Sequence, residues 1–398
     1  MRPPLSALVI RELKALWQDP WQLALVSYLP LVGIFMLWWL FSAGLPRALP
    51  VALVDQDMSQ LSRSLGRNLA ASPVITPISY PDLLSAQQAM KEAEVYAMVV
   101  LPYGLRKDLL TAKQPVIDIR YNGQFLLVGK LLVSQIQQSL GAGLSELAGI
   151  KQMAAGVPKV KVETRLRPVA SQVTPLFNMN KSYLVFLLPP VLIALGQLLA
   201  MLVFANCLSR EVRLGKLTQC YRAGIWRVIG VKFLLYTPLL ILQGKLILAV
   251  LYQYLALPLA GKFGQLLLAQ FLMISAVWLI VLAIFFLLLD ATRLVSFCTA
   301  LFAPAFPFMG ITFPTQNMPV LAQWWRQIMP SSHYIETHVG VVSYGQSWFN
   351  MLQQVASYWG FLLLVPVIFY LVKRQRKALA VMSTADKPDD ITQPSRGI

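Results

Sequence analysis

The chain has 398 residues, of which 57% are hydrophobic and only 13% are charged, and its formal net charge is +17. Soluble domains usually carry about a quarter charged residues, so this composition excludes an ordinary soluble protein and predicts a membrane protein. Most basic residues in the short loops flank apolar runs, which orientation in a membrane and attraction to anionic headgroups explain more simply than nucleic-acid binding.

Residues 1–20 are expected to form an amphipathic helix in the membrane interface on the cytoplasmic side. Apolar side chains recur at helical spacing through 5–18, and one acid, Glu12, interrupts them. The apolar stripe consists of Leu5, Leu8, Val9, Leu13, Leu16 and Trp17. The segment is too short and too charged to span a bilayer, although an ordinary cytosolic helix fits the same pattern.

A long apolar run follows, from Leu23 to Ala43. Its length of about 21 residues exceeds the apolar core of a signal peptide, which is about 7–15 residues. We therefore expect a retained transmembrane helix over 21–43. Pro30 lies inside it, which membrane helices tolerate where neighbouring groups re-satisfy the freed carbonyl.

Residues 44–180 change character and predict an extracytoplasmic (periplasmic) α/β domain, because short apolar strands alternate with helical segments. Asp82 is placed to cap one of the helices. The chain's three cysteines all lie outside this segment, so it has no disulfide framework. The expected elements are strands at 49–57, 74–80, 96–104, 115–123 and 159–168, and helices at 59–72, 82–95, 106–113 and 125–155.

Residues 181–373 predict a bundle of five transmembrane helices. With the first span, the expected fold is an α-helical integral membrane protein with six transmembrane helices and an inserted extracytoplasmic α/β domain. A basic cytoplasmic loop lies at 208–232, a water-exposed external segment with interfacial tryptophans at 314–354, and a cytoplasmic tail at 374–398. The expected spans are 183–207, 233–259, 266–289, 295–313 and 355–372.

The distribution of basic residues predicts the orientation. With six spans, the segments that share a side with the N-terminus hold 14 Lys or Arg up to Lys377, whereas the short loops opposite hold two, Lys262 and Arg326. Short cytoplasmic loops collect Lys and Arg. Both termini are therefore expected in the cytoplasm of a multi-pass protein of the plasma membrane, which in a bacterium with two membranes is the inner membrane.

Several short motifs, in this order and spacing, resemble those of type-2 ABC exporter permeases over nearly the whole chain. After the second span stand Arg210-Glu211, Gly215, Lys216-Leu217-Thr218 and Gly230-Val231-Lys232. The other matching stretches are Leu49–Asp57, Ala97–Pro102, Gly310–Pro314, Met318-Pro319 and Met329-Pro330. The last three resemble the family's re-entrant external segment between the final two spans.

The resemblance implies a permease subunit of an ATP-driven ABC exporter that works with a separate ABC ATPase subunit and a second permease copy or a paralogue. A short rigid element in the 208–232 loop would transmit closure of the ATPase to the spans, although a solvated basic connector fits the composition too. The candidate coupling residues are Arg210, Glu211, Arg213, Gly215, Lys216, Thr218 and Arg222. Glu211 is a candidate to pair with a basic residue of the ATPase, and a periplasmic adaptor is a further candidate partner.

The sequence carries no phosphate-binding loop of its own. Such a loop needs GxxxxGK followed by Ser or Thr, whereas the Gly-Lys pairs ending at Lys130, Lys216, Lys245 and Lys262 are each followed by Leu or Phe. We therefore expect no catalytic residue and no bound cofactor in this chain, with ATP and Mg²⁺ held by the partner ATPase.

One ionisable residue, Lys245, lies well inside an expected span, where such groups often mark a translocation path. A tilted span with a snorkelling lysine explains the same position. Gln243 beside it, together with Phe306 and Phe308, completes the candidate path. Aromatic residues of spans are, however, more often lipid or helix contacts. His333, Glu336 and His338 lack the spacing of a zinc site and favour a packed external helix without a metal.

The sequence is compatible with several substrate classes. Wide apolar spans favour an amphiphilic or drug-like small molecule by analogy, while export of a polysaccharide or lipid is an alternative. A membrane-anchored periplasmic binding or assembly scaffold is the rival from another class. The five clustered C-terminal spans argue against it, because a scaffold needs only one or two.

Overall fold

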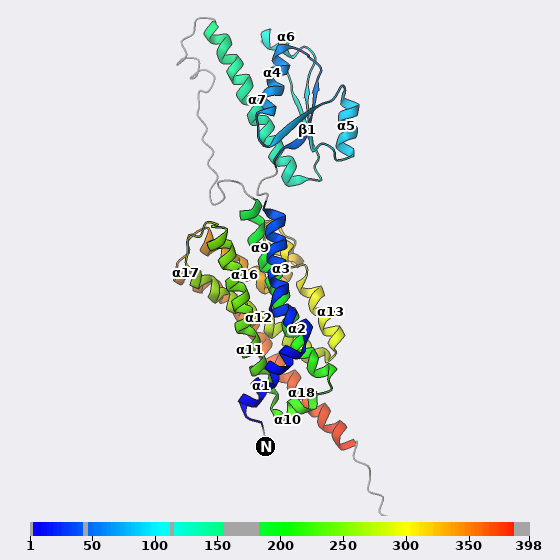
Figure 1. Ribbon diagram of the computed structural model, residues 1–398, viewed down its shortest axis with the longest axis vertical. Coiled ribbons are helices and arrows are strands. Elements are labelled where there is room, and N and C mark those ends of the chain that lie inside the picture. Colours follow the sequence, from blue (N-terminus) through cyan, green and yellow to red (C-terminus); the bar gives the residue numbers. More distant parts are fainter. Residues whose placement is uncertain (1–2, 43–46, 112–114, 155–182, 386–398) are drawn as a thin grey trace, which may run out of the picture. The chain divides into compact units, whose positions relative to one another are not determined.

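The computed structural model describes residues 3–42, 47–111, 115–154 and 183–385 (Figure 1). The chain divides into two compact units. Residues 1–42 and 180–398 form the helical unit, and residues 43–179 form the α/β unit. Each unit has its own hydrophobic core.

The helical unit contains long apolar helices and several shorter ones, joined by tight breaks. A π-helical turn at Val250–Tyr254 and a 3₁₀ segment at Ala356–Leu363 extend two of the long helices. The helices are α1 Leu5–Gln18, α2 Pro20–Val26, α3 Tyr28–Phe41, α9 Tyr183–Arg213, α10 Leu217–Ala223, α11 Ile225–Ala249, α12 Phe263–Leu288, α13 Ala291–Phe302, α14 Ala305–Phe308, α15 Val320–Ile328, α16 Pro330–Val342, α17 Trp348–Val355 and α18 Leu364–Ala385.

Within the described residues, five helical stretches are long and apolar enough to cross a membrane, or six if the bent pair α2–α3 counts as one span. The pair bends by 45° at Ser27. Pro30 accounts for the bend, since it has no N–H for the carbonyl of Val26 and its ring crowds that carbonyl. The five stretches are Leu184–Arg213, Ile225–Tyr254, Phe263–Leu288, Ala291–Phe308 and Trp348–Ala378.

Helix α12 lies at the centre of the helical unit and contacts α9, α11, α13, α16 and α18 (Figure 1). It is apolar on all sides, and most of its side chains are buried. A helix of that composition is suited to the middle of a bundle rather than to its surface. At Leu289, with φ of 48°, the chain turns, and Asp290 caps α13 by accepting a hydrogen bond from the N–H of Arg293 at 2.8 Å.

Three expected segments differ from the structure. The 208–232 loop is helical at both ends, because α9 continues to Arg213 and α11 begins at Ile225. Residues 314–354 are not water-exposed throughout: α16 is buried and packs on α9 and α12. The last candidate span begins at Trp348, whereas the sequence placed it from residue 355.

The α/β unit is a four-stranded sheet in the order β2-β1-β3-β4, in which β1 pairs parallel with β2 and β3, and β3 pairs antiparallel with β4. The order of elements matches the sequence expectation as far as α7. The expected strand at 159–168 lies outside the described residues. The elements are β1 Leu49–Asp55, α4 Gln60–Ala70, β2 Ile75–Ser79, α5 Leu83–Lys91, β3 Ala97–Leu101, α6 Leu105–Leu110, β4 Asp118–Tyr121 and α7 Leu126–Ala154.

The sheet buries a different set of side chains on each face, as the alternation of strand residues requires. Val51 and Val99 belong to the core that includes residues of α4 and α7, whereas Ala52 and Met98 pack with residues of α5. Figure 1 shows α4 and α7 on one side of the sheet and α5 on the other. Both faces are thus covered, which suits a largely parallel sheet.

The expected N-cap of α5 is confirmed. The carboxylate of Asp82 accepts a hydrogen bond from the backbone N–H of Ser85 at 2.7 Å. This hydrogen bond favours the ionised form, so the pKa of Asp82 lies below its ordinary value.

Candidate functional site

The short helix α10 lies between two long helices, and a glycine turn sits at each of its ends. Gly215 has φ of 64° and Gly224 has φ of 95°, both in the region that L side chains rarely adopt. α9 ends at Arg213 and α11 starts at Ile225, so α10 is a compact corner between two candidate spans. It lies at the same end of the helical unit as α1 (Figure 1).

The two faces of α10 differ in burial. Cys220 is buried, and Leu217 and Tyr221 pack against the main hydrophobic core. Four polar residues at its start and along its outer face are exposed: Lys216, Thr218, Gln219 and Arg222. The helix is therefore anchored on one side and presents a basic, polar surface on the other.

Behind α10, four buried charged residues from α1, α9 and α11 and the partly exposed Arg11 form a cluster, here named the ion cluster: Arg11, Glu12, Arg210, Glu211 and Lys232. Lys232 and Glu12 are each 1% exposed. The ammonium of Lys232 donates to both carboxylate oxygens of Glu12, at 2.9 and 3.0 Å, and to the carbonyl of Cys207 at 2.9 Å. Arg210 also pairs with Glu12, whose Oε1 accepts from the hydroxyl of Tyr236 at 3.2 Å.

Glu211 completes the ion cluster on the side nearest α10. Its Oε1 lies 3.0 Å from the ammonium of Lys232 and 3.2 Å from Nη2 of Arg11. Its Oε2 accepts from the thiol of Cys220 at 3.3 Å. Through Cys220, this carboxylate touches α10 itself, so α1, α9, α10 and α11 meet at one set of contacts.

The electrostatics keep Glu12 ionised. Burial alone would raise its pKa, but the charges of Lys232 and Arg210 and the hydrogen bond from Lys232 outweigh burial, so the pKa lies below its ordinary value. Burial, together with the negative charge of Glu211, raises the pKa of the Cys220 thiol to about 11. The ion cluster is thus a set of formal charges rather than a neutral hydrogen-bonded network.

A second polar contact joins the start of α2 to α9. The amide of Asn206 donates to the carboxylate of Asp19 at 3.0 Å and to the side chain of Gln22 at 2.6 Å. Arg213 donates to Asn206 Oδ1 at 2.9 Å. Gln22 in turn donates to the carbonyl of Val203 at 3.2 Å. The junction residue Asp19 and the first turn of α2 are therefore fixed to α9.

The structure separates the expected coupling residues into two groups. Arg213, Gly215, Lys216, Thr218 and Arg222 are exposed. Arg210 and Glu211 are buried in the ion cluster and have partners within this chain. Glu211 therefore makes internal contacts in this structure, instead of presenting its carboxylate on the surface.

Two central members of the ion cluster, Glu12 and Lys232, were absent from the expected coupling residues. The signal for Glu12 was present, because it is the one acid on an otherwise apolar helical stripe. In the structure Leu8, Glu12 and Leu16 are the buried residues of α1, while Trp17 is 72% exposed. Only the i, i+4 line through Glu12 faces the other helices, which a stripe drawn from hydrophobicity alone does not show.

The candidate path residues are not joined to one another. Gln243 is half-buried, and its side chain donates to the carbonyl of Leu25 at 3.1 Å, while Lys245 is exposed. Phe306 and Phe308 are half-buried on α14, and the ring of Phe308 lies 6.3 Å from that of Trp325. Among the described residues, no hydrogen bond or ring contact links any two of these four side chains.

The two histidines of α16 have ordinary structural partners. His333 Nδ1 lies 2.9 Å from the hydroxyl of Ser357, and its Nε2 lies 2.9 Å from the carbonyl of Gln327. Nε2 of His338 lies 2.7 Å from the hydroxyl of Tyr252. In the part of the chain that the structure describes, no group of three His, Cys, Asp or Glu is placed to hold a metal ion.

Comparison with known families gives one match that covers most of the chain. Residues 20–372 match the family model described as ABC-2 family transporter protein. A search of curated proteins finds no significant match. The matched range includes the candidate spans except the last six residues of Trp348–Ala378, together with α10, three of the five residues of the ion cluster and the α/β unit. The chain therefore belongs to the ABC-2 family of transporter proteins, as a transmembrane subunit.

Proposed function

We propose that this chain is the permease subunit of an ATP-driven exporter, and that the exposed face of α10 docks on a separate ABC ATPase subunit. Membership of the ABC-2 family supports an ATPase partner. The structure of the corner supports this docking site. α10 is a short helix with one face buried, glycine turns at both ends and basic side chains on the other face.

In this proposal, the ion cluster transmits a movement of α10 to the spans. An element that relays motion from a motor must move with the spans that it drives, as a rigid body. Lys232 of α11 binds acids of both α1 and α9, and Glu211 of α9 contacts Cys220 of α10. A displacement of α10 would therefore carry α9, α11 and α1 together. Glu211 acts in this scheme as a positioning residue within the permease.

The exporter would contain two such permeases, or this chain and a paralogue, with two ATPase subunits on the side of the basic loops. That side would be the cytoplasm, with both termini there and the α/β unit outside, in a plasma membrane. ATP binding would favour one conformation and hydrolysis would reset the other, with ATP chemistry on the partner. The substrate class that fits wide apolar spans is an amphiphilic or drug-like molecule.

The test is co-purification of the tagged, detergent-solubilised chain from its native membrane, with an ATPase assay on the eluate. In the test variant, Lys216→Glu is combined with Arg222→Glu on α10. The matched control combines Arg374→Glu with Lys377→Glu, which are exposed basic residues of α18. We expect the α10 variant to lose most of the co-purified ATPase activity while the control retains it.

Two outcomes would overturn the proposal. If the α10 variant keeps its full share of the ATPase, the docking site lies elsewhere. If no ATPase co-purifies with the unmodified chain, the exporter proposal is wrong and the hypothesis of a membrane-anchored binding or assembly scaffold is favoured. A thermal melt of each variant separates loss of docking from loss of folding, because Lys216 and Arg222 are exposed and their replacement is expected to leave the fold intact.

A further inference from the structure

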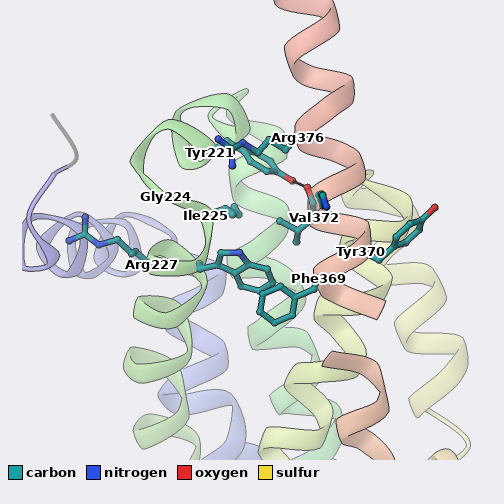
Figure 2. A pocket seen from close by; sticks show the side chains of 10 residues that line it. Tyr221, Gly224, Ile225, Arg227, Phe369, Tyr370, Val372 and Arg376 are labelled. Atoms are coloured by element: carbon teal, nitrogen blue, oxygen red, sulfur yellow. Dashed lines mark hydrogen bonds between the residues drawn. The ribbon is translucent and has the colours of Figure 1, made fainter. Parts of the chain in front are cut away.

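A pocket of about 520 Å³ lies between the corner at α10–α11 and helix α18 (Figure 2). Its lining includes Tyr221 and Trp226 from the corner, and Phe369, Lys373 and Arg376 from α18. Residues 369, 373 and 376 are spaced by four and three positions, so they lie on one face of α18. None of these residues belongs to the ion cluster or to the exposed face of α10.

The pocket has an aromatic end and a cationic end. Figure 2 shows Phe369 at one end, with Tyr221 and Arg376 at the other, and the ring of Trp226 stacks against that of Phe369. The rings of Trp226 and Phe369 are 4.2 Å apart between centroids and inclined by 32°. They remain 40% and 53% exposed, so this stacked pair is an open apolar surface rather than part of the core.

The cationic end carries two charges and no compensating acid. Lys373 and Arg376 are exposed, and the lining contains no Asp or Glu. Across the described residues, neither side chain forms an ion pair. Arg227 also borders the pocket, but Figure 2 shows its guanidinium directed away from the stacked rings. The hydroxyl of Tyr221 donates to the carbonyl of Val372 at 3.3 Å and joins the two walls.

The pocket follows the direction in which a bilayer changes from apolar to polar. Near the end of its candidate span Trp348–Ala378, α18 changes from apolar to basic residues in the order Phe369, Lys373, Arg376, and seven residues of helix rise about 10 Å. The headgroup layer of a bilayer is about 5–8 Å thick on each side. The aromatic end thus matches the depth of the acyl chains and glycerol, and the cationic end matches the depth of the phosphates.

We propose that this pocket binds one anionic phospholipid from the leaflet on the side of the basic loops. Its phosphate lies between Lys373 and Arg376, and its acyl chains lie against Trp226 and Phe369. Basic pockets between transmembrane helices suit acidic lipid headgroups. A soluble phosphate would leave the stacked rings uncovered, and an acidic surface of a partner protein offers nothing apolar for them. The lipid would join the α10 corner to α18.

The test uses native mass spectrometry of the delipidated full chain in detergent, titrated with phosphatidylglycerol or with phosphatidylcholine of the same acyl chains. The test variant combines Lys373→Gln with Arg376→Gln. The matched control combines Arg374→Gln with Lys377→Gln, which removes the same charge from the same helix outside the pocket lining. At about 1 kcal/mol per basic residue, we expect phosphatidylglycerol binding to fall roughly 30-fold in the test variant. It should stay within about threefold in the control.

A second arm probes the aromatic end and the nature of the ligand. Trp226→Ala should weaken binding of phosphatidylglycerol, and inorganic phosphate should not displace the lipid. Equal losses in the test and control variants would overturn the proposal in favour of diffuse attraction to the basic helix. Equal binding of phosphatidylcholine would overturn it in favour of an uncharged groove.

Displacement of the lipid by inorganic phosphate would overturn the proposal and show that the pocket is a phosphate site. Loss of the co-purified ATPase in the test variant, with lipid binding unchanged, would instead make this surface part of a protein interface. Thermal melts of all variants confirm that the chain is folded in each titration.

Discussion

The basic residues around α10 fall into two groups that are neighbours in the sequence and opposites in the structure. Arg210 and Lys232 are 7% and 1% exposed and hold two carboxylates between three helices. Lys216 and Arg222, between them in the sequence, are exposed. The same residue types thus serve to fix the permease internally and to present charge to its surroundings.

The two groups differ in the free-energy cost of replacing a charged residue. A buried ion that loses its partner keeps its desolvation cost without compensation, whereas an exposed ion is screened by water. The buried group should therefore control folding, and the exposed group should control association. The predictions below test that division, beginning with the largest effect on stability.

Lys232→Met should destabilise the helical unit by about 3–5 kcal/mol, because Glu12 and Glu211 would both remain buried with one cation fewer. The measurement is thermal unfolding in detergent. Lys245→Met is the matched control, since it changes the same residue type on the same helix at an exposed position. Equal shifts for the two variants would show that the ion cluster contributes little to stability.

Gly224→Ala should destabilise by about 1–3 kcal/mol, because its φ of 95° strains any L side chain. Gly230→Ala is the control: Gly230 lies inside α11, and a Cβ there would meet no atom within 4 Å. Alanine is favoured over glycine in a helix, so Gly230→Ala should be neutral or stabilising. The melting temperature of Gly224→Ala should therefore fall, whereas that of Gly230→Ala should stay the same or rise.

The contribution of Glu12 should depend on pH. Its pKa is lowered in the folded chain, so the stabilisation is fully present above the ordinary value of 4.5 and is lost as the pH falls through the folded pKa. Melting temperatures of the unmodified chain and of Glu12→Gln should therefore differ at pH 7 and converge below pH 4.5. A constant difference across this range would mean that Glu12 acts through its shape and not its charge.

The smallest effect on stability is expected at the exposed face of α10. Lys216→Gln combined with Arg222→Gln should change the free energy of unfolding by no more than about 0.5 kcal/mol, since both side chains are exposed and contribute no ion pair among the described residues. Unfolding in denaturant would measure it. A loss of several kcal/mol would place these residues in the internal group.

Much of the helical unit was predictable because its signals are local. Apolar runs of span length are read within a single segment, and the structure shows candidate spans at these places, although the helix expected over 21–43 is bent by 45° between α2 and α3. The α/β unit was predictable for the same reason, since strand and helix periods alternate and caps such as Asp82 are short-range.

What escaped prediction depends on contacts between distant segments. Glu12 and Lys232 are 220 positions apart, and nothing near either residue in the sequence reveals the other. The burial of α16 has the same origin: a packed helix at His333 and His338 was expected within a water-exposed segment, but its enclosure by α9 and α12 was not. The rings of His333 and His338 then find Ser357 and Tyr252 as partners, which composition cannot indicate.

The three cysteines of the chain have a practical consequence for spectroscopy. All three are buried and free, and Cys220 has its thiol pKa raised to about 11, so little reactive thiolate exists at neutral pH. The natural chain should therefore be almost silent toward maleimide reagents. A cysteine placed at exposed Thr218 would be the site of attachment for a spin or fluorescent label, which would report movement of α10 during turnover without first removing the native thiols.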